Sequence, residues 1–357
     1  MSDTLSVCYV LSYYSPDYVR TRTLVAALRA IPGLSLYEAR NTSTDALRYL
    51  QTLWKLLVVR LKCAPRYYVL GFRGYELFWP VRLLTLGHPL VYDQMMSPYD
   101  SLVHEHRRLH EGSLVGRIVH LYEKGILHAA DRVLTDTDCH RRFLHEAFDL
   151  PLSKIDTIPV GADEGLFSPR AARRRAGREF EVLFYGSFLP LHGVETVLRA
   201  AALLRDDPIR FTLVGGSAAA RRDAAQLAGG LGLTKLTQID WIDFVSLPEL
   251  IASSDLGLGG PFGNTGQARR VITGKTFQFL AMGRPVVVGE TDVDTGFVDK
   301  ANCLLVPQAD PAALADAVAW ASGHPSELAR IGQAGRDLYK SRYSIERISQ
   351  ELRRILT

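Results

Sequence analysis

The chain has few cysteines, and none is spaced for a metal site or a redox motif. Its four cysteines, Cys8, Cys63, Cys139 and Cys303, lie far apart along 357 residues and form no CxxC motif. Three of them lie in or beside apolar segments, where a free thiol usually serves as a small core residue. This usage predicts a reducing, cytosolic location.

Long apolar runs and a strong net charge are also missing. No apolar run approaches ~18 residues, so no transmembrane helix is predicted. The segment 5–11 lacks the basic flank and the cleavage motif of a signal peptide. The formal net charge is +4 at pH 7, too small to indicate a nucleic-acid partner. With 47% apolar and 22% charged residues, the composition is that of a globular protein of about two domains.

A dinucleotide-binding fingerprint is absent as well. The first expected strand, 5–11, runs into an aromatic and basic loop that has no GxGxxG pattern. Loops after the first strand of a doubly wound fold often line the ligand cleft. Tyr14 and Arg20 are therefore candidate ligand contacts, and Arg20 fits equally well as a solvated charge on the helix expected at 20–30.

Strands and helices alternate in two successive series. The first series has expected strands at 5–11, 67–70, 89–92, 132–134 and 155–159, and the second has them at 181–185, 211–214, 235–240, 256–258, 286–288 and 303–306. Residues 168–178 hold Pro169 and five arginines and make the best linker. The pattern predicts an α/β fold with two Rossmann-like domains, at 1–165 and 166–340. An amphipathic helix within 341–357 is expected to cross back and pack on the first domain.

Polar residues gather after two strands of the first series. Asp93, Ser97, Tyr99 and Asp100 follow the strand at 89–92, and Asp136 follows the strand at 132–134. An α/β cleft places its chemistry at such strand ends. Asp93 and Asp100 are candidates to orient an acceptor or a sugar, and each fits equally well as a helix cap.

The segment 44–62 has the spacing of an amphipathic helix. Leu50, Leu53, Trp54, Leu57 and Leu61 make one apolar stripe, with basic residues on another face. Two interpretations stay open: the stripe packs on the N-terminal sheet, or the helix lies on an anionic membrane surface.

A glycine-rich loop and a short helix at 255–289 predict an anion site. The loop after the strand at 256–258 holds four glycines, which allow a ligand to approach the backbone. Thr273 is a plausible N-cap, Lys275 lies in the first turn, and Gly283 is the expected C′ residue. The helix N-terminus and the lysine together suit a phosphorylated ligand, although an ordinary βαβ connection has the same pattern.

The order of several motifs resembles retaining GT-B glycosyltransferases of family four, glycosyl transferases group 1, of the bacterial envelope-polysaccharide type. The resemblance rests on the segments 182–193, 214–216, 241–255, 274–287 and 303–314, with 18–24, 93–100 and 130–140 resembling a bacterial branch. It implies two facing domains with a cleft between them, the first for the acceptor and the second for a nucleotide-sugar donor.

The resemblance also assigns roles to individual residues. It implies that Lys275, Arg270, Asp93 and Asp100 are catalytic, and that Tyr14, Arg20, Ser97, Tyr99 and Asp136 lie on the acceptor side. The donor-binding residues would be Gly186, Ser187, His192, Gly215, Trp241, Ile242, Asn264, Thr265, Arg269, Gly274, Thr276 and Gln278. No metal or cofactor is implied, and the DxD-like Asp292-Val-Asp294 is expected in a sugar-contacting or structural loop.

Four positions depart from the family pattern. Where such enzymes usually carry two glutamates eight positions apart, this chain has Arg270 and Gln278. Gln278 can still hydrogen-bond a ribose diol, whereas Arg270 cannot accept from sugar hydroxyls but can bind a diphosphate. Ser187 and His192 replace the usual arginine and lysine, so the positive charge is expected to come from Lys275, helped by Arg269, Arg270 and His192.

The predicted function is therefore transfer of a sugar, with retention of configuration and without a metal, to a glycan or a lipid-linked acceptor of the cell envelope. The expected location is cytoplasmic, with peripheral contact at the inner face of the membrane. Two alternatives remain: a sugar-nucleotide epimerase with the same architecture, and a degenerate transferase that acts as a non-catalytic partner subunit.

Overall fold

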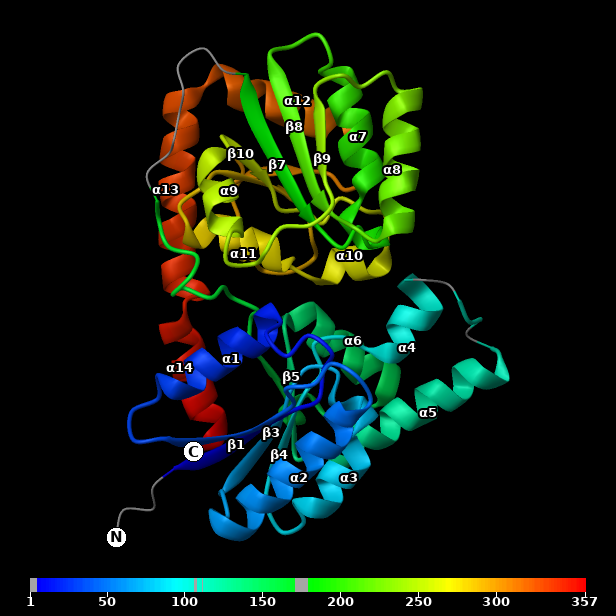
Figure 1. Cartoon of the computed structure of the whole chain (residues 1–357), viewed down its shortest axis with the longest axis vertical. Helices are drawn as coiled ribbons and strands as arrows, with labels where there is room; N and C mark the ends of the chain where they lie inside the picture. Colours follow the sequence, from blue (N-terminus) through cyan, green and yellow to red (C-terminus); the bar gives the residue numbers. More distant parts are fainter. Residues whose placement is uncertain (1–4, 106–107, 111, 171–178) are drawn as a thin grey trace. The chain divides into compact units, whose positions relative to one another are not determined.

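The chain forms two compact α/β units. The computed structural model describes residues 5–105, 108–110, 112–170 and 179–357. Unit 1 comprises Met1–Gly161 with Ile345–Thr357, and unit 2 comprises Ala162–Ser344 (Figure 1). Residues 171–178 of the predicted linker lie outside the described residues.

Unit 1 is built on a parallel sheet of six strands in the order β2-β1-β3-β4-β5-β6. The strands are β1 (Ser6–Leu11), β2 (Ser35–Arg40), β3 (Tyr67–Leu70), β4 (Leu90–Asp93), β5 (Arg132–Thr135) and β6 (Ile155–Thr157). The helices are α1 (Val19–Arg29), α2 (Leu47–Lys62), α3 (Phe78–Leu84), α4 (Pro98–Asp100), α5 (Leu114–Ala129), α6 (Asp138–Phe148) and α14 (Ile345–Leu356).

Alternate residues of the strands build one apolar core on each face of this sheet. Cys8 and Val10 face α2, α3, α5 and α6. Their neighbours Val7 and Tyr9 face α1 and α14, where Ile348 and Leu352 join the core. The last helix of the chain is therefore part of unit 1, as the period-two alternation of a buried strand and the apolar stripe of α14 require.

Unit 2 repeats the architecture with a parallel sheet in the order β12-β11-β10-β7-β8-β9. Its strands are β7 (Phe180–Gly186), β8 (Ile209–Gly215), β9 (Leu236–Ile239), β10 (Leu256–Leu258), β11 (Val286–Gly289) and β12 (Leu304–Val306). The helices are α7 (Val194–Leu203), α8 (Ala218–Gly230), α9 (Leu247–Ser253), α10 (Gly266–Arg270), α11 (Gly274–Ala281), α12 (Pro311–Gly323) and α13 (Pro325–Arg342).

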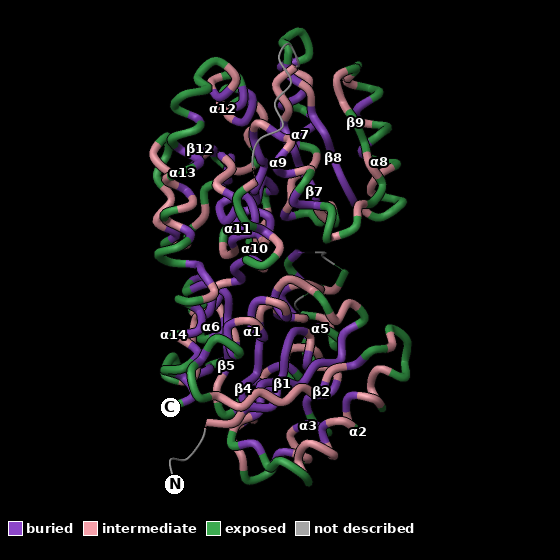
Figure 2. Tube along the Cα trace, turned by 60° about the vertical axis from the view of Figure 1, so that its left-hand side comes forward, coloured by how far each residue is buried: buried purple, intermediate pink, exposed green. Residues whose placement is uncertain are grey.

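Helices α7, α8 and α12 cover one face of this second sheet and share its core with Phe184 and Leu213. In Figure 2 the central strands β7 and β8 are largely buried, whereas the helices expose one side. Two parallel six-stranded sheets with helices confirm the predicted α/β class.

One strand, β2, was not predicted from the sequence. Its residues, Ser-Leu-Tyr-Glu-Ala-Arg, are mostly half-buried, and only Ala39 is fully buried. It forms the edge of the sheet, where one side of the strand stays open to solvent. The apolar signal that marks a central strand is therefore weak.

The helix predicted at 44–62 exists as α2, but most of its apolar stripe points to solvent. Thr52 and Leu56 are its only buried residues, while Leu50, Trp54 and Leu61 are exposed. The interpretation that this stripe packs on the sheet is therefore wrong for these three side chains.

Candidate functional site

The first turn of α11 presents backbone N–H groups that no side chain caps. Thr273 occupies the N-cap position, as predicted, but its side chain makes no capping hydrogen bond. Its hydroxyl donates instead to the Gly259 carbonyl, at 2.5 Å, and lies 3.1 Å from the Thr276 hydroxyl. The N–H groups at the start of a helix have no partner within it. Those of Gly274 and Lys275 are thus available to a ligand with negative charge.

Lys275 is a buried cation without an anion beside it. Its side chain is only 6% exposed, and its Nζ lies 5.0 Å from the centre of the Phe184 ring. Among the described residues it makes no hydrogen bond or ion pair. Burial lowers its pKa to about 7, because desolvation disfavours the charged form. A buried charge of this kind needs a partner, and a ligand anion would supply one.

Gly186 and His192 border the same ammonium group. Gly186 ends β7 with a φ of +147°, and a Cβ there would lie 3.8 Å from Lys275 Nζ and 3.1 Å from the His192 ring. The His192 Nδ1 is buried without a hydrogen-bond partner among the described residues. Burial, and then the charge of Lys275, lower the His192 pKa well below its usual value, so the ring is neutral. The missing side chain of Gly186 leaves the space beside both groups open.

Gln278, which takes the place of an expected glutamate, is paired with a residue that the sequence analysis missed. The Tyr185 hydroxyl donates to Gln278 Oε1 at 2.6 Å, and both side chains are buried. Burial also raises the Tyr185 pKa well above its usual value, so the hydroxyl stays a donor. This bond fixes the orientation of the amide and leaves its nitrogen to donate to a ligand.

The remaining predicted donor residues lie around this group with different exposures. Gly215 packs so closely that a Cβ there would fall 2.3 Å from the Gly186 carbonyl oxygen. Thr265 caps α10 by accepting from the Ala268 N–H at 3.1 Å. The two arginines that end α10, Arg269 and Arg270, are exposed and half-buried, respectively. The others are the buried Thr276, the half-buried Ile242, and the exposed Ser187, Asn264 and Trp241.

A cavity of about 660 Å³ opens between α7 and α8 in the same unit. Its apolar wall includes Phe188, Leu198 and Leu227, and Glu195 and Asn264 contribute polar groups. Of the predicted donor residues, only Asn264 lines it. The cavity is therefore separate from the group of Gly186, His192 and Lys275.

The DxD-like segment shows no arrangement of metal ligands. Asp294 forms an ion pair with Arg342 at 3.2 Å, and the Asp292 N–H donates to the Arg269 carbonyl. Across the part of the chain that the structure describes, no three His, Cys, Asp or Glu side chains gather as a metal site would require.

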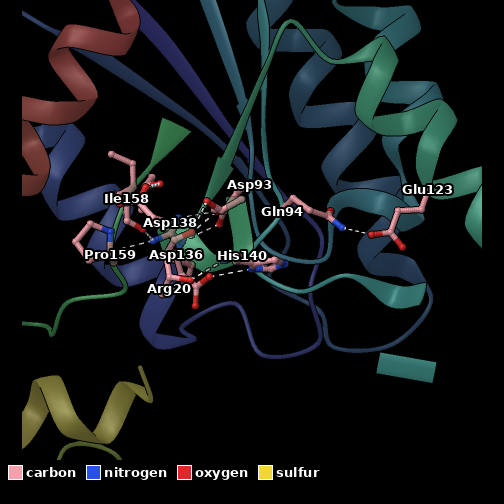
Figure 3. A network of polar contacts seen from close by, with 12 residues as sticks. Arg20, Asp93, Gln94, Glu123, Asp136, Asp138, His140, Ile158 and Pro159 are labelled. Carbon is pink, nitrogen blue, oxygen red and sulfur yellow. Dashed lines mark hydrogen bonds and ion pairs between the residues drawn. The ribbon is translucent and has the colours of Figure 1, made fainter. Parts of the chain in front are cut away.

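In unit 1, Arg20 and Asp93 bind each other. The Arg20 guanidinium is fully buried and forms a bidentate pair with the Asp93 carboxylate, with Nη2 2.8 Å from Oδ1 (Figure 3). Its Nη1 donates to the carbonyls of Ile158 and Pro159 at 2.6 and 2.9 Å. These bonds join α1, β4 and the segment after β6, so they position the end of the sheet.

The other predicted acceptor residues make separate contacts in unit 1. His140 Nδ1 lies 2.9 Å from Asp136 Oδ1. Ser97 caps α4 by accepting from the Asp100 N–H at 3.1 Å, and the Tyr99 N–H donates to Glu123. Tyr14 is exposed, and the centre of its ring lies 4.3 Å from that of Tyr13, with the two ring planes tilted by 52°.

Glu123 was missed because it lies in the middle of α5, far from any strand end. Its carboxylate accepts from Gln94 and from the Tyr99 N–H, at 2.5 and 2.8 Å (Figure 3). Burial raises its pKa to about 8. Nothing in its sequence context distinguishes it from a solvated helix carboxylate.

The family comparison identifies part of unit 2. Residues 179–323 match the family model described as glycosyl transferases group 1. The matched region begins just before β7 and ends with α12, so it contains Gly186, His192, Lys275 and Gln278.

Several curated relatives carry the name D-inositol 3-phosphate glycosyltransferase. The protein from Nocardia farcinica is 32% identical over 59% of this chain and 49% of its own length. The one from Kineococcus radiotolerans is 31% identical over 45% of this chain and 40% of its own. The chain therefore spans about half of these relatives or less.

Solved structures of glycosyltransferases share the fold along nearly the entire chain. Sucrose-phosphate synthase from Thermosynechococcus elongatus has a TM-score of 0.75 at 18% identity, covering 98% of both chains. Anabaena HepE in complex with UDP-glucose has a TM-score of 0.74 at 13% identity, covering 98% of this chain and 99% of its own. The fold is thus that of GT-B glycosyltransferases, with two Rossmann-like units.

Proposed function

We propose that the protein is a glycosyltransferase that moves a sugar from a nucleoside-diphosphate sugar to an acceptor hydroxyl. The observation that carries the proposal is the buried, unpaired ammonium of Lys275 beside the uncapped first turn of α11. The match of residues 179–323 to glycosyl transferases group 1 supports it, as does the bound UDP-glucose of the structurally similar HepE.

Each group at this site has a task in the reaction. The N–H groups of Gly274 and Lys275 and the Lys275 ammonium hold the diphosphate, whose negative charge grows as the sugar–phosphate bond breaks. Fixed donors in a site without water stabilise such a charge strongly, and removing one costs about 3 kcal/mol of barrier. Gln278, oriented by Tyr185, donates to a ribose hydroxyl. Arg269 and Arg270, which end α10, add positive charge.

We further propose that the transfer retains the anomeric configuration and needs no metal. In this mechanism the acceptor oxygen attacks the anomeric carbon from the face that the diphosphate leaves, and a diphosphate oxygen takes the proton of the acceptor. No Asp or Glu occurs between Asp255 and Glu290, which agrees with a reaction that has no carboxylate nucleophile in this loop. Activity is expected to persist in EDTA; its loss and recovery with Mg²⁺ would contradict the metal-independent mechanism.

We propose that the acceptor is an envelope glycan or a lipid-linked sugar. D-Inositol 3-phosphate should be included in the acceptor panel, because the curated relatives carry its name. Asp100 and Asp136, which follow β4 and β5 in unit 1, are the proposed acceptor-side carboxylates, and Asp93, bound by Arg20, positions the strand end. A lipid-linked acceptor would bring the protein to the inner face of the cytoplasmic membrane.

A thermal-shift panel identifies the donor. Uridine, guanosine, adenosine and thymidine diphosphates, and their sugars, are each added to the purified chain. The correct ligand should raise the unfolding temperature most, since binding to the folded state alone stabilises it. The proposal predicts one clearly preferred base, and no shift with any diphosphate would overturn the donor site.

Turnover then separates transfer from the two alternatives. Release of the nucleoside diphosphate only in the presence of an acceptor supports transfer. Formation of an epimeric sugar nucleotide without an acceptor would identify an epimerase instead. Saturable binding without turnover across the acceptor panel would identify a degenerate partner subunit, in which Arg270 replaces a catalytic glutamate.

A further inference from the structure

The outer surface of α2, α3 and α5 in unit 1 is unusually apolar. Of the nineteen exposed large apolar side chains among the described residues, twelve lie on these three helices or directly after α3. We refer to this set as the apolar face. It consists of Leu47, Leu50, Trp54, Leu61, Trp79, Leu83, Leu86, Leu114, Val115, Ile118, Leu121 and Tyr122.

The exposed side chains follow helical spacing and thus form continuous stripes. On α5, Leu114, Ile118, Leu121 and Tyr122 are separated by four, three and one positions, and Leu114 is 74% exposed. Side chains with this spacing share one side of a helix. The stripe is not part of the core, because the buried residues of α5 include Ile126 and Leu127 instead.

Contacts between the three helices make the stripes one surface. A Cβ on Gly125 of α5 would lie 3.7 Å from the Trp79 ring of α3, and the Tyr122 hydroxyl donates to the Tyr75 carbonyl just before α3. Helices α2 and α3 also touch. All three cover the same side of the sheet in unit 1, as Figure 1 shows.

The charge on these helices has one sign. They carry seven arginines or lysines, at positions 48, 55, 60, 62, 82, 117 and 124, and a single acid, Glu123. That acid is buried and hydrogen-bonded to Gln94 and to the Tyr99 N–H. Arg48, Arg82 and Lys124 pair with Glu76, Asp131 and Asp149 of neighbouring segments. The other four cations, Lys55, Arg60, Lys62 and Arg117, form no ion pair among the described residues, so the uncompensated charge of these helices is positive.

We propose that the apolar face binds an anionic lipid bilayer. Trp54, Leu61, Ile118 and Leu121 would enter the boundary between headgroups and acyl chains, as the apolar side of an interfacial helix does. The surrounding arginines and lysines would attract anionic lipids. A protein partner with an apolar groove would not need this one-signed charge. Within the described residues no helix combines the length and apolar character needed to cross a bilayer, so the contact is with one leaflet.

The inference rests on the membrane location in the proposed function, and it assigns the membrane contact to the apolar face. It also makes the acceptor chemistry more specific, because a transferase held on a leaflet can take an acceptor whose lipid part stays in the membrane. It does not depend on Lys275 or on the donor.

The test is flotation of the full chain with vesicles of phosphatidylcholine alone or mixed with phosphatidylglycerol at 7:3. Wild type is expected to bind the mixed vesicles at least tenfold more tightly than the neutral ones. Ile118→Gln with Leu121→Gln should reduce this affinity at least tenfold. Arg60→Glu with Lys62→Glu should reduce it several-fold for mixed vesicles and leave the weak binding to neutral ones unchanged.

Matched controls lie outside the apolar face. Leu203→Gln with Val298→Gln changes two exposed apolar side chains of unit 2, and Lys340→Glu with Arg353→Glu makes the same change in net charge. Both control variants should float like wild type. Binding of a nucleoside diphosphate, measured on every variant, should stay unchanged, so the vesicle result and the donor site are judged separately.

Three results would overturn the proposal. The first is wild-type protein that does not float with mixed vesicles, and the second is equal flotation of the Ile118 and Leu121 variant. The third is a dimer in light scattering that this variant converts to monomer, because the apolar face would then bind a second copy of the chain.

Discussion

Units 1 and 2 each bury a cation near the carboxyl end of a parallel sheet, but the two cations have opposite surroundings. Arg20 in unit 1 is fully buried and binds Asp93 and two backbone carbonyls. Lys275 in unit 2 is almost as buried, has no anionic partner among the described residues, and has its pKa lowered to about 7.

This difference distinguishes a structural role for one buried cation from a binding role for the other. A buried charge with its hydrogen bonds filled is neutralised within the protein, so it positions the chain around it. A buried charge without an anion is held at a cost to stability. Such a cost is typical of functional sites, which trade stability for binding. Arg20 is therefore a positioning residue, and we propose that Lys275 is a ligand contact.

Asp93→Ala tests the structural half of the comparison and should have the largest effect. It leaves Arg20 buried without its carboxylate, and breaking a buried pair in this way costs about 3–5 kcal/mol. Hydrogen exchange measured by mass spectrometry should show much faster exchange in α1 and β4, with β7 as the internal reference.

The control is Arg29→Ala, which removes an exposed pair with Glu38 and should cost about 1 kcal/mol or less. If Asp93→Ala left exchange in unit 1 unchanged, Arg20 would not depend on its partner.

Lys275→Met tests the functional half. It keeps the length of the side chain but removes the charge that we propose meets the diphosphate. Affinity for the nucleoside diphosphate selected by the thermal-shift panel should fall about a hundredfold, the scale of one strong charge-assisted contact. The free protein should become more stable by about 1–2 kcal/mol near pH 6.

Isothermal titration calorimetry and thermal unfolding measure the two effects together, with the exposed Lys340→Met as the matched control. A variant with lower stability and wild-type affinity would reverse the assignment and make Lys275 structural.

Tyr185→Phe tests the smallest element of the donor site. It removes the hydroxyl that fixes the Gln278 amide, and a buried hydrogen bond contributes about 1 kcal/mol. Nucleotide affinity should fall about fivefold, whereas an otherwise identical diphosphate without a ribose should bind as before. Tyr37→Phe in unit 1 is the control. An equal loss for both ligands would mean that the Gln278 amide does not contact the ribose.

The sequence predicted the fold better than it predicted the site. Periodicity and strand-end residues located five of the strands of unit 1 and all six strands found in unit 2, because a buried parallel strand has a clear apolar signal. The edge strand β2 has no such signal. The sequence could not distinguish the exposed apolar stripe of α2 from one that packs on the core, because amphipathic spacing alone does not determine whether the apolar side of a helix is buried.

The site is harder because partners depend on contacts between distant segments. Lys275 and Gln278 stand out by their place in a short helix after a glycine-rich loop. Nothing in the sequence, however, places Tyr185 against Gln278 or leaves Lys275 without an anion. Arg20 and Asp93 were both singled out, but 73 positions separate them. Their mutual pairing, which gives them a positioning role, appears only in the fold.

The most direct test of Lys275 as the donor cation is the proton taken up when a nucleotide sugar binds. At pH 8 a lysine with a pKa of about 7 is mostly neutral, and the diphosphate would raise that pKa and charge it. The lowered pKa of His192 keeps its ring neutral there, and the diphosphate of a nucleotide sugar keeps its charge. Affinity should thus be full below pH 7 and fall as the pH rises, by about tenfold per pH unit.

Calorimetry at pH 8 in buffers of different ionisation enthalpy counts this proton. The account predicts uptake close to one proton for wild type and none for Lys275→Arg, whose guanidinium is always charged. Equal uptake by the two proteins, or affinity independent of pH between 6 and 9, would contradict it.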